Sequence, residues 1–102
     1  MVDFYSSPPF NGGHIAIPIN EVRITPIAEQ ILIDAGVDPS DLVRRHAFGD
    51  WGDTLPDQWQ MNIDGLKRKD CIESIYKVGR GEIWVITDPG WKVTTICTFI
   101  ER

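Results

Sequence analysis

The chain has 102 residues, of which 42% are hydrophobic and 25% charged, so it fits one domain with a modest core and is too short for a second. Its 15 acidic against 10 basic residues give a net charge of -5, which has the wrong sign for holding duplex DNA through phosphate contacts. No apolar run approaches the ~20 residues that a membrane helix needs. We therefore expect neither strong duplex DNA binding nor membrane insertion.

The first 20 residues predict two kinds of segment. Residues 1–13 are rich in Ser, Pro and Gly and have no apolar period, so we expect a flexible leader before a single α+β domain at 14–102. Residues 14–20 alternate, with isoleucines on one side, which predicts a short strand. Pro18 cannot donate a ladder hydrogen bond, so this segment is expected at a sheet edge or as an extended arm.

Two helices are predicted from residue 25 to residue 48. Thr25-Pro26 is a typical helix start, and apolar residues at helical spacing follow until Gly36 ends the helix. Asp38-Pro39 begins a second helix in the same way, and Gly49 is the expected stop. Its inner stripe comprises Leu42, Val43, His46 and Ala47.

A third helix is predicted from about residue 55 to residue 67. Thr54 with Asp57 can cap its first turn. Asn62 falls on its apolar face, where an apolar residue would pack best. The rest of that face is made of Leu55, Trp59, Ile63 and Leu66.

After the third predicted helix, the apolar residues recur at every second position, which is typical of strands. Turns at residues 79–81 and 89–90 separate three strands, at 72–78, 82–88 and 91–100. One side of the first carries Ile72, Ser74, Tyr76 and Val78. The fold class predicted is α+β, with two to three N-terminal helices packed on a C-terminal three- to four-stranded antiparallel meander.

The residue types able to bind metals or cofactors are few. Cys71 and Cys97 lie in strand-like segments without a CxxC pair, so we expect buried reduced thiols and a cytoplasmic protein. The two His and two Cys are scattered, and no calcium-loop spacing occurs. The turn at residues 79–81 lacks the pattern of a phosphate-binding loop. We predict no metal and no cofactor.

The most informative segment is residues 46–53, His-Ala-Phe-Gly-Asp-Trp-Gly-Asp, where titratable groups stand beside glycines and an indole. His46 is either a core histidine with satisfied hydrogen bonds or a partly buried general acid or base. Asp50 and Asp53 either cap turns or set the tautomer and raise the pKa of the imidazole. Trp51 is either a core residue or a stacking surface.

Three further polar side chains are candidates. Asn62 is expected to tie the turn at residues 49–53 to the third helix or to face a pocket. Ser74 and Tyr76 place hydroxyls on one strand face. Ser74 lacks the strained turn of a nucleophile, so a nucleophilic triad is not supported.

The block His46-x-x-Gly49-Asp50-Trp51-Gly52-Asp53 is specific, and it is supported by Thr25-Pro26 before a helix, Arg45, Asn62, Ser74-x-Tyr76, residues 83–88 and Thr94-Thr95. Together these motifs resemble a family of small uncharacterised proteins often carried by plasmids, phages and other mobile elements, some labelled as a type I restriction enzyme subunit. The resemblance covers roughly residues 17–96. The family usually has Asp-Arg-Ser where this chain has residues 89–92, and its Pro-Glu-Glu-Tyr ending is replaced here by residues 99–102. Membership implies no established activity.

Two functional hypotheses follow. The first is a binding or regulatory module, such as a host-interference factor, with an unidentified protein partner or RNA as ligand; its contact residues are Arg45, Asp50, Trp51, Asp53 and Asn62. The alternative rests on the order of helices and strands, which looks like that of RelE-type and barnase-type ribonucleases. In that metal-independent mechanism the candidate catalytic residues are His46, Ser74 and Tyr76. Whether the protein is an enzyme is left open.

Overall fold

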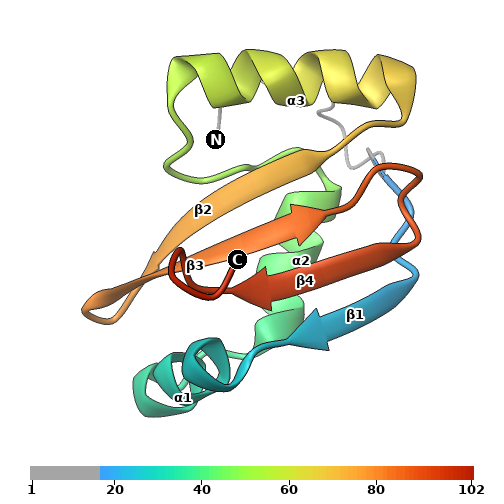
Figure 1. The fold of residues 1–102 in the computed structure, drawn as a ribbon. Helices are drawn as coiled ribbons and strands as arrows, with labels where there is room; N and C mark the ends of the chain where they lie inside the picture. Colours follow the sequence, from blue (N-terminus) through green and yellow to red (C-terminus); the bar gives the residue numbers. More distant parts are fainter. Residues whose placement is uncertain (1–16) are drawn as a thin grey trace.

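The computed structural model describes residues 17–102, which form three helices and four strands (Figure 1). In chain order these are β1 (Glu21–Ile24), α1 (Pro26–Ala35), α2 (Pro39–Ala47), α3 (Pro56–Arg68), β2 (Ile72–Val78), β3 (Gly81–Thr87) and β4 (Val93–Cys97). The predicted α+β class is confirmed. The predicted leader at 1–13 lies outside the described residues.

The strands form one sheet in the order β1-β4-β3-β2. β2, β3 and β4 are an antiparallel meander, as the period-two pattern and the two turns predict. The fourth strand, β1, instead pairs parallel with β4, so the sheet is mixed and the all-antiparallel expectation is wrong at this edge.

The edge strand is also later in the chain than predicted. Residues 17–20 are not a strand, and residues 14–16 lie outside the described part. Ile17 is buried, and its amide donates to the Ala47 carbonyl at the end of α2. Pairing with β4 begins only after Pro18, where the Glu21 amide donates to the Lys92 carbonyl. Ile17 therefore packs against the end of α2 and does not pair in the sheet.

The helices lie on one face and one edge of the sheet. α2 packs on β2 and β3, α1 packs on β4 and β2, and α3 runs beside β2 (Figure 1). The main core lies between the sheet and α1 and α2; its residues are Ala28, Leu32, Leu42, Tyr76, Val78, Ile83, Val85 and Ile96. No helix within residues 17–102 is long and apolar enough to cross a membrane.

The ends of α1 and α2 follow local rules. Gly36, in the left-handed region with φ of 67°, ends α1 as predicted. The Asp38 side chain accepts from the Ser40 amide at the start of α2. α2 ends at Ala47 with Phe48 as its C-cap, so the helix stops before Gly49, which is the first left-handed residue after it.

α3 begins differently from the prediction. Its N-cap is Leu55, whose amide donates to the Gln58 side chain, and Thr54 with Asp57 makes no cap. Leu55 is 65% exposed and Trp59 39% exposed, so only Ile63 and Leu66 of the predicted apolar face pack into the core. The reason is the position of α3 beside the edge of β2, because a strand edge covers a narrower part of a helix surface than a sheet face does.

The start of α1 is capped from the far end of the chain. The Glu101 carboxylate accepts from the Thr25 hydroxyl, the Ile27 amide at 3.0 Å, and the amide and hydroxyl of Thr98. Thr25, the residue that was expected to cap, makes no side-chain cap itself. Although desolvation opposes ionisation, these hydrogen bonds hold the pKa of Glu101 at about 2.

Glu101→Gln is therefore expected to lower the midpoint of thermal unfolding at pH 7. The folded pKa lies below the ordinary value of 4.5, so the stabilisation is complete above that value and is lost as the pH falls toward 2. The difference in midpoint between wild type and Glu101→Gln should shrink as the pH is lowered from 7 to 3. Glu82→Gln, on an exposed strand position, is the control; an equal loss in both variants would contradict the role of Glu101.

Candidate functional site

The segment 48–53 is an ordered turn that closes the free edge of β2. After Gly49, with φ of 88°, the chain runs parallel to β2, so that the Ile75 amide donates to the Trp51 carbonyl at 3.1 Å. The Asp53 amide donates to the Ile75 carbonyl at 2.7 Å. The predicted motif thus has a structural role, because an unpaired strand edge would otherwise lie open.

Gly52 is required by this close approach. A Cβ at Gly52 would lie 2.1 Å from the Ile75 carbonyl oxygen and 2.7 Å from Cδ1 of Tyr76, and φ at this residue is 67°. Both the space and the backbone conformation exclude any other residue without a shift of β2.

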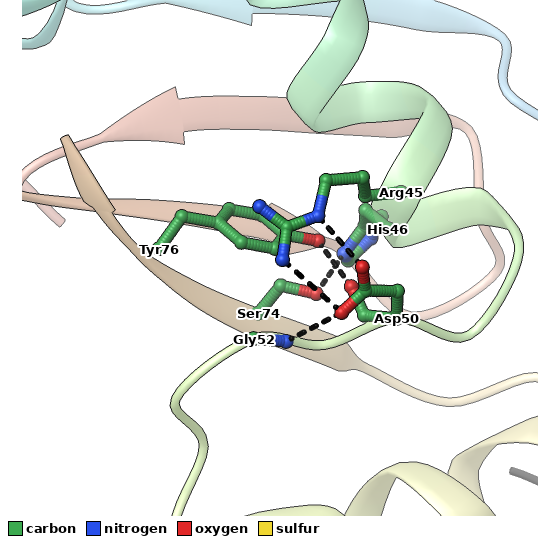
Figure 2. Close-up of polar contacts among 6 residues, drawn as sticks. All are labelled: Arg45, His46, Asp50, Gly52, Ser74 and Tyr76. Atoms are coloured by element: carbon green, nitrogen blue, oxygen red, sulfur yellow. Dashed lines mark hydrogen bonds and ion pairs between the residues drawn. The ribbon is translucent and has the colours of Figure 1, made fainter. Parts of the chain in front are cut away.

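His46 is fully buried at the centre of a chain of hydroxyl groups. Its Nδ1 lies 2.6 Å from the Ser74 hydroxyl (Figure 2), and its Nε2 lies 2.8 Å from the Thr87 hydroxyl. Thr87 in turn bonds the Thr94 hydroxyl at 2.7 Å. A neutral imidazole has one donor and one acceptor, and a hydroxyl can match either, so Ser74 on β2 and Thr87 on β3 satisfy both ring nitrogens. With Thr94, the chain of hydrogen bonds links α2 to β2, β3 and β4.

Burial decides the protonation state of this histidine. Desolvation lowers the pKa of His46 from 6.5 to about 3, so the imidazole is neutral at physiological pH. A general acid or base must come within hydrogen-bond reach of its substrate. With 0% exposure and both ring nitrogens hydrogen-bonded, His46 lies in the core.

The exposed part of the motif is a charged corner made by Arg45, Asp50 and Asp53, hereafter the Arg45 corner. Arg45 donates from Nε to Asp50 at 2.7 Å and from Nη2 at 3.3 Å, and its guanidinium lies 4.5 Å above the Tyr76 ring (Figure 2). The hydrogen bond to Asp50 raises the pKa of Arg45. The arginine is therefore held between a carboxylate and an aromatic face.

Asp50 and Tyr76 fix the corner to the sheet. The Gly52 amide donates to Asp50 Oδ1 at 3.2 Å, and the Tyr76 hydroxyl donates to the Asp50 carbonyl at 2.6 Å (Figure 2). Burial raises the pKa of Tyr76, so this hydroxyl stays protonated. Tyr76 is 2% exposed and thus acts as a buried support for the turn.

Trp51 and Asn62, two further candidates, are buried. Trp51 packs between α2 and α3, with its ring 6.0 Å from the ring of Trp59 in an edge arrangement. Asn62 donates to the Glu73 carbonyl at 2.7 Å and accepts from the Glu73 amide at 2.9 Å. It therefore ties α3 to the outer edge of β2 and not, as one expectation had it, to the turn at 49–53. Asn62 also lines a small cavity of ≈20 Å³ between α3 and β2, which agrees with the other expectation, that it faces a pocket.

The sequence prediction missed two members of the histidine chain, Thr87 and Thr94. Their alternation with Val85 and Ile96 places both hydroxyls on the helix-facing side of the sheet, and that signal was available. The pairing of Thr87 with Thr94 across β3 and β4 then brings the two hydroxyls together.

Comparisons with protein-family models, with curated proteins and with solved structures gave no match. The resemblance to the mobile-element family stays a prediction. Within residues 17–102 no group of three or more His, Cys, Asp or Glu side chains is arranged to hold a metal ion.

Proposed function

We propose that the protein is a binding or regulatory module of mobile-element type that contacts a protein partner through the Arg45 corner. The observation that carries this proposal is the full burial of His46 with both ring nitrogens hydrogen-bonded. His46 is thereby enclosed in the core, and the charged groups of the motif that remain exposed are those of the Arg45 corner.

The geometry of the corner suits recognition. Arg45 is held by Asp50 and by the Tyr76 ring, so little side-chain entropy is lost when a partner binds. Its Nη1 makes no hydrogen bond to any residue of the described range and is available to a partner. Arginine held in this way is typical of residues that dominate binding energy at protein interfaces.

The cysteines support the proposed cytoplasmic setting. Both are free thiols; Cys97 is buried as expected, whereas Cys71 is only half-buried. Desolvation, with the charge of Glu73 as a further cause, raises the pKa of Cys71 to about 11, so the thiolate that reacts is scarce at neutral pH.

The binding proposal predicts a charge-reversal effect confined to the corner. A photo-crosslinking amino acid at Asp53 identifies the partner, whose dissociation constant is then measured with purified proteins. Arg45→Glu should weaken binding by about tenfold or more, the scale of an interface hot spot. The control is Arg44→Glu, whose side chain is exposed and paired with Asp41 outside the corner. Equal losses in both variants, or none in either, would contradict the proposal.

The ribonuclease alternative is tested separately. Wild type and His46→Ala are incubated with single-stranded RNA in EDTA, and both are expected to leave the RNA intact because His46 does not reach the surface. Cleavage by the wild type that falls ~10²–10⁴-fold in the variant would restore the enzyme hypothesis and overturn the proposal.

A further inference from the structure

A groove of ≈480 Å³ lies between α1 and the turn that joins β2 to β3, away from the Arg45 corner. Its apolar lining comes from Ile31 and Ala35 on α1 and from Val78 at the end of β2. Gly79 and Gly81 form the opposite wall. The volume falls within the ~300–1,000 Å³ typical of ligand sites.

The two glycines keep this groove wide. A Cβ at Gly81 would lie 3.2 Å from Cδ1 of Ile31, and a Cβ at Gly79 would lie 3.5 Å from Cβ of Ala35. Gly79 also has φ of 57°, which the tight turn requires. Side chains at either position would extend toward α1 and narrow the space between helix and turn.

Two charged side chains of opposite sign line the groove, Arg80 and Asp34. Arg80, at the tip of the turn, is exposed and makes no ion pair or side-chain hydrogen bond to the part of the chain described here. Asp34, on the α1 side, accepts from the Gln30 side-chain amide at 2.8 Å, a neutral donor that does not cancel the charge of the carboxylate. Arg80 is therefore the charged side chain of the groove that has no hydrogen-bond or ion-pair partner within residues 17–102, and Asp34 is the group that would attract a cationic probe.

The apolar surface of α1 continues beyond the groove. Ile27 lies one helical turn before Ile31, on the same face, because residues four apart stack along a helix. Its side chain is 51% exposed. Ile27 is not among the residues that line the groove, so a ligand contacts it only by extending beyond the groove toward the start of α1.

We propose that this groove is a docking site for a peptide segment of a partner, which inserts an apolar side chain against Ile31 and Val78 and places a carboxylate on Arg80. Apolar lining gives the contact area, and the unpaired guanidinium selects the charge. The site is separate from the Arg45 corner and does not depend on the function proposed for it.

Three small probes test both parts of the proposal: N-acetyl-leucine with a carboxylate, neutral N-acetyl-leucinamide, and cationic leucinamide. Each is titrated into the full chain labelled with ¹⁵N, and the backbone amide shifts are followed. N-acetyl-leucine should shift the amides of Ile31 and residues 78–81 at millimolar concentration, with N-acetyl-leucinamide weaker and leucinamide weakest. Shifts outside the groove, no shifts, or a preference for leucinamide would each overturn the proposal.

Two variants with a matched control test the apolar contact and the charge preference separately. Ala35→Phe fills the groove and should abolish the shifts, whereas Ile33→Phe, which adds bulk on another face of α1 at a side chain 64% exposed, should leave them unchanged. Arg80→Gln lies in an exposed turn and should keep the leucine contact while removing the preference for the carboxylate. Binding that survives Ala35→Phe, or a preference that survives Arg80→Gln, would overturn the corresponding part.

Discussion

Gly52→Ala is expected to destabilise the protein by about 3 kcal/mol or more. The left-handed backbone alone costs roughly 1–2 kcal/mol for a residue with a Cβ. The added methyl would also lie 2.1 Å from the Ile75 carbonyl oxygen, so the turn must move away from β2 and lose the two backbone bonds that join them. Urea unfolding of the purified protein measures the loss as a lower midpoint.

Gly36→Ala provides a matched control for this effect. Gly36 has the same φ of 67°, but a Cβ there meets nothing within 4 Å. Its replacement should cost only the backbone term of roughly 1–2 kcal/mol. If the two variants lose the same free energy of unfolding, the close contact between residue 52 and β2 is not what requires glycine there.

His46→Ala is expected to lower the free energy of unfolding by about 3–4 kcal/mol at pH 7, the range for deleting a large buried ring. The loss has two sources: a cavity between α2 and the sheet, and buried hydroxyls of Ser74 and Thr87 left without their partner. Thr95→Ala, on the opposite face of β4, is a control that should lose much less. A loss in His46→Ala no larger than in the control would contradict the core role.

The same histidine makes stability depend on pH. The pKa of His46 is about 3 in the folded protein and 6.5 ordinarily, so the unfolded state binds the extra proton and unfolding becomes easier as the pH falls below 6.5. The free energy of unfolding of the wild type should therefore fall by about 2 kcal/mol between pH 7 and pH 5 through His46. His46→Ala lacks this contribution, so its disadvantage should shrink by that amount at pH 5. A parallel pH dependence in both proteins would show that the imidazole is not buried neutral.

Much of the local structure was predictable. Gly36 after an apolar helical period, the prolines at the starts of α1 and α2 and the two glycine turns around β3 are signals between neighbouring residues, and each marks a boundary within a residue or two. The inward face of β2, with Ser74 and Tyr76, followed from alternation alone. The polar motif was found for the same reason: its glycines and carboxylates are adjacent in the chain.

The parts that were not predictable depend on contacts between distant residues. The sequence around His46 would be the same whether the side chain lined a cleft or lay in the core. Its Nε2 is hydrogen-bonded only because folding brings Thr87, 41 residues later, next to it. Asn62 reaches Glu73 because α3 lies along the strand edge, which no pattern within α3 reveals. β1 pairs parallel with β4 across more than 70 residues.

The sequence by itself therefore determined the α+β class, the helices, the meander and the position of the polar motif, because periodicity and turn chemistry act over a few residues. The tertiary structure alone decided that His46 is neutral and enclosed, that Gly52 touches β2, and that Arg45, Asp50 and Asp53 form the exposed part of the motif. Burial and protonation depend on which distant groups replace water around a side chain, and that replacement is settled only when the chain has folded.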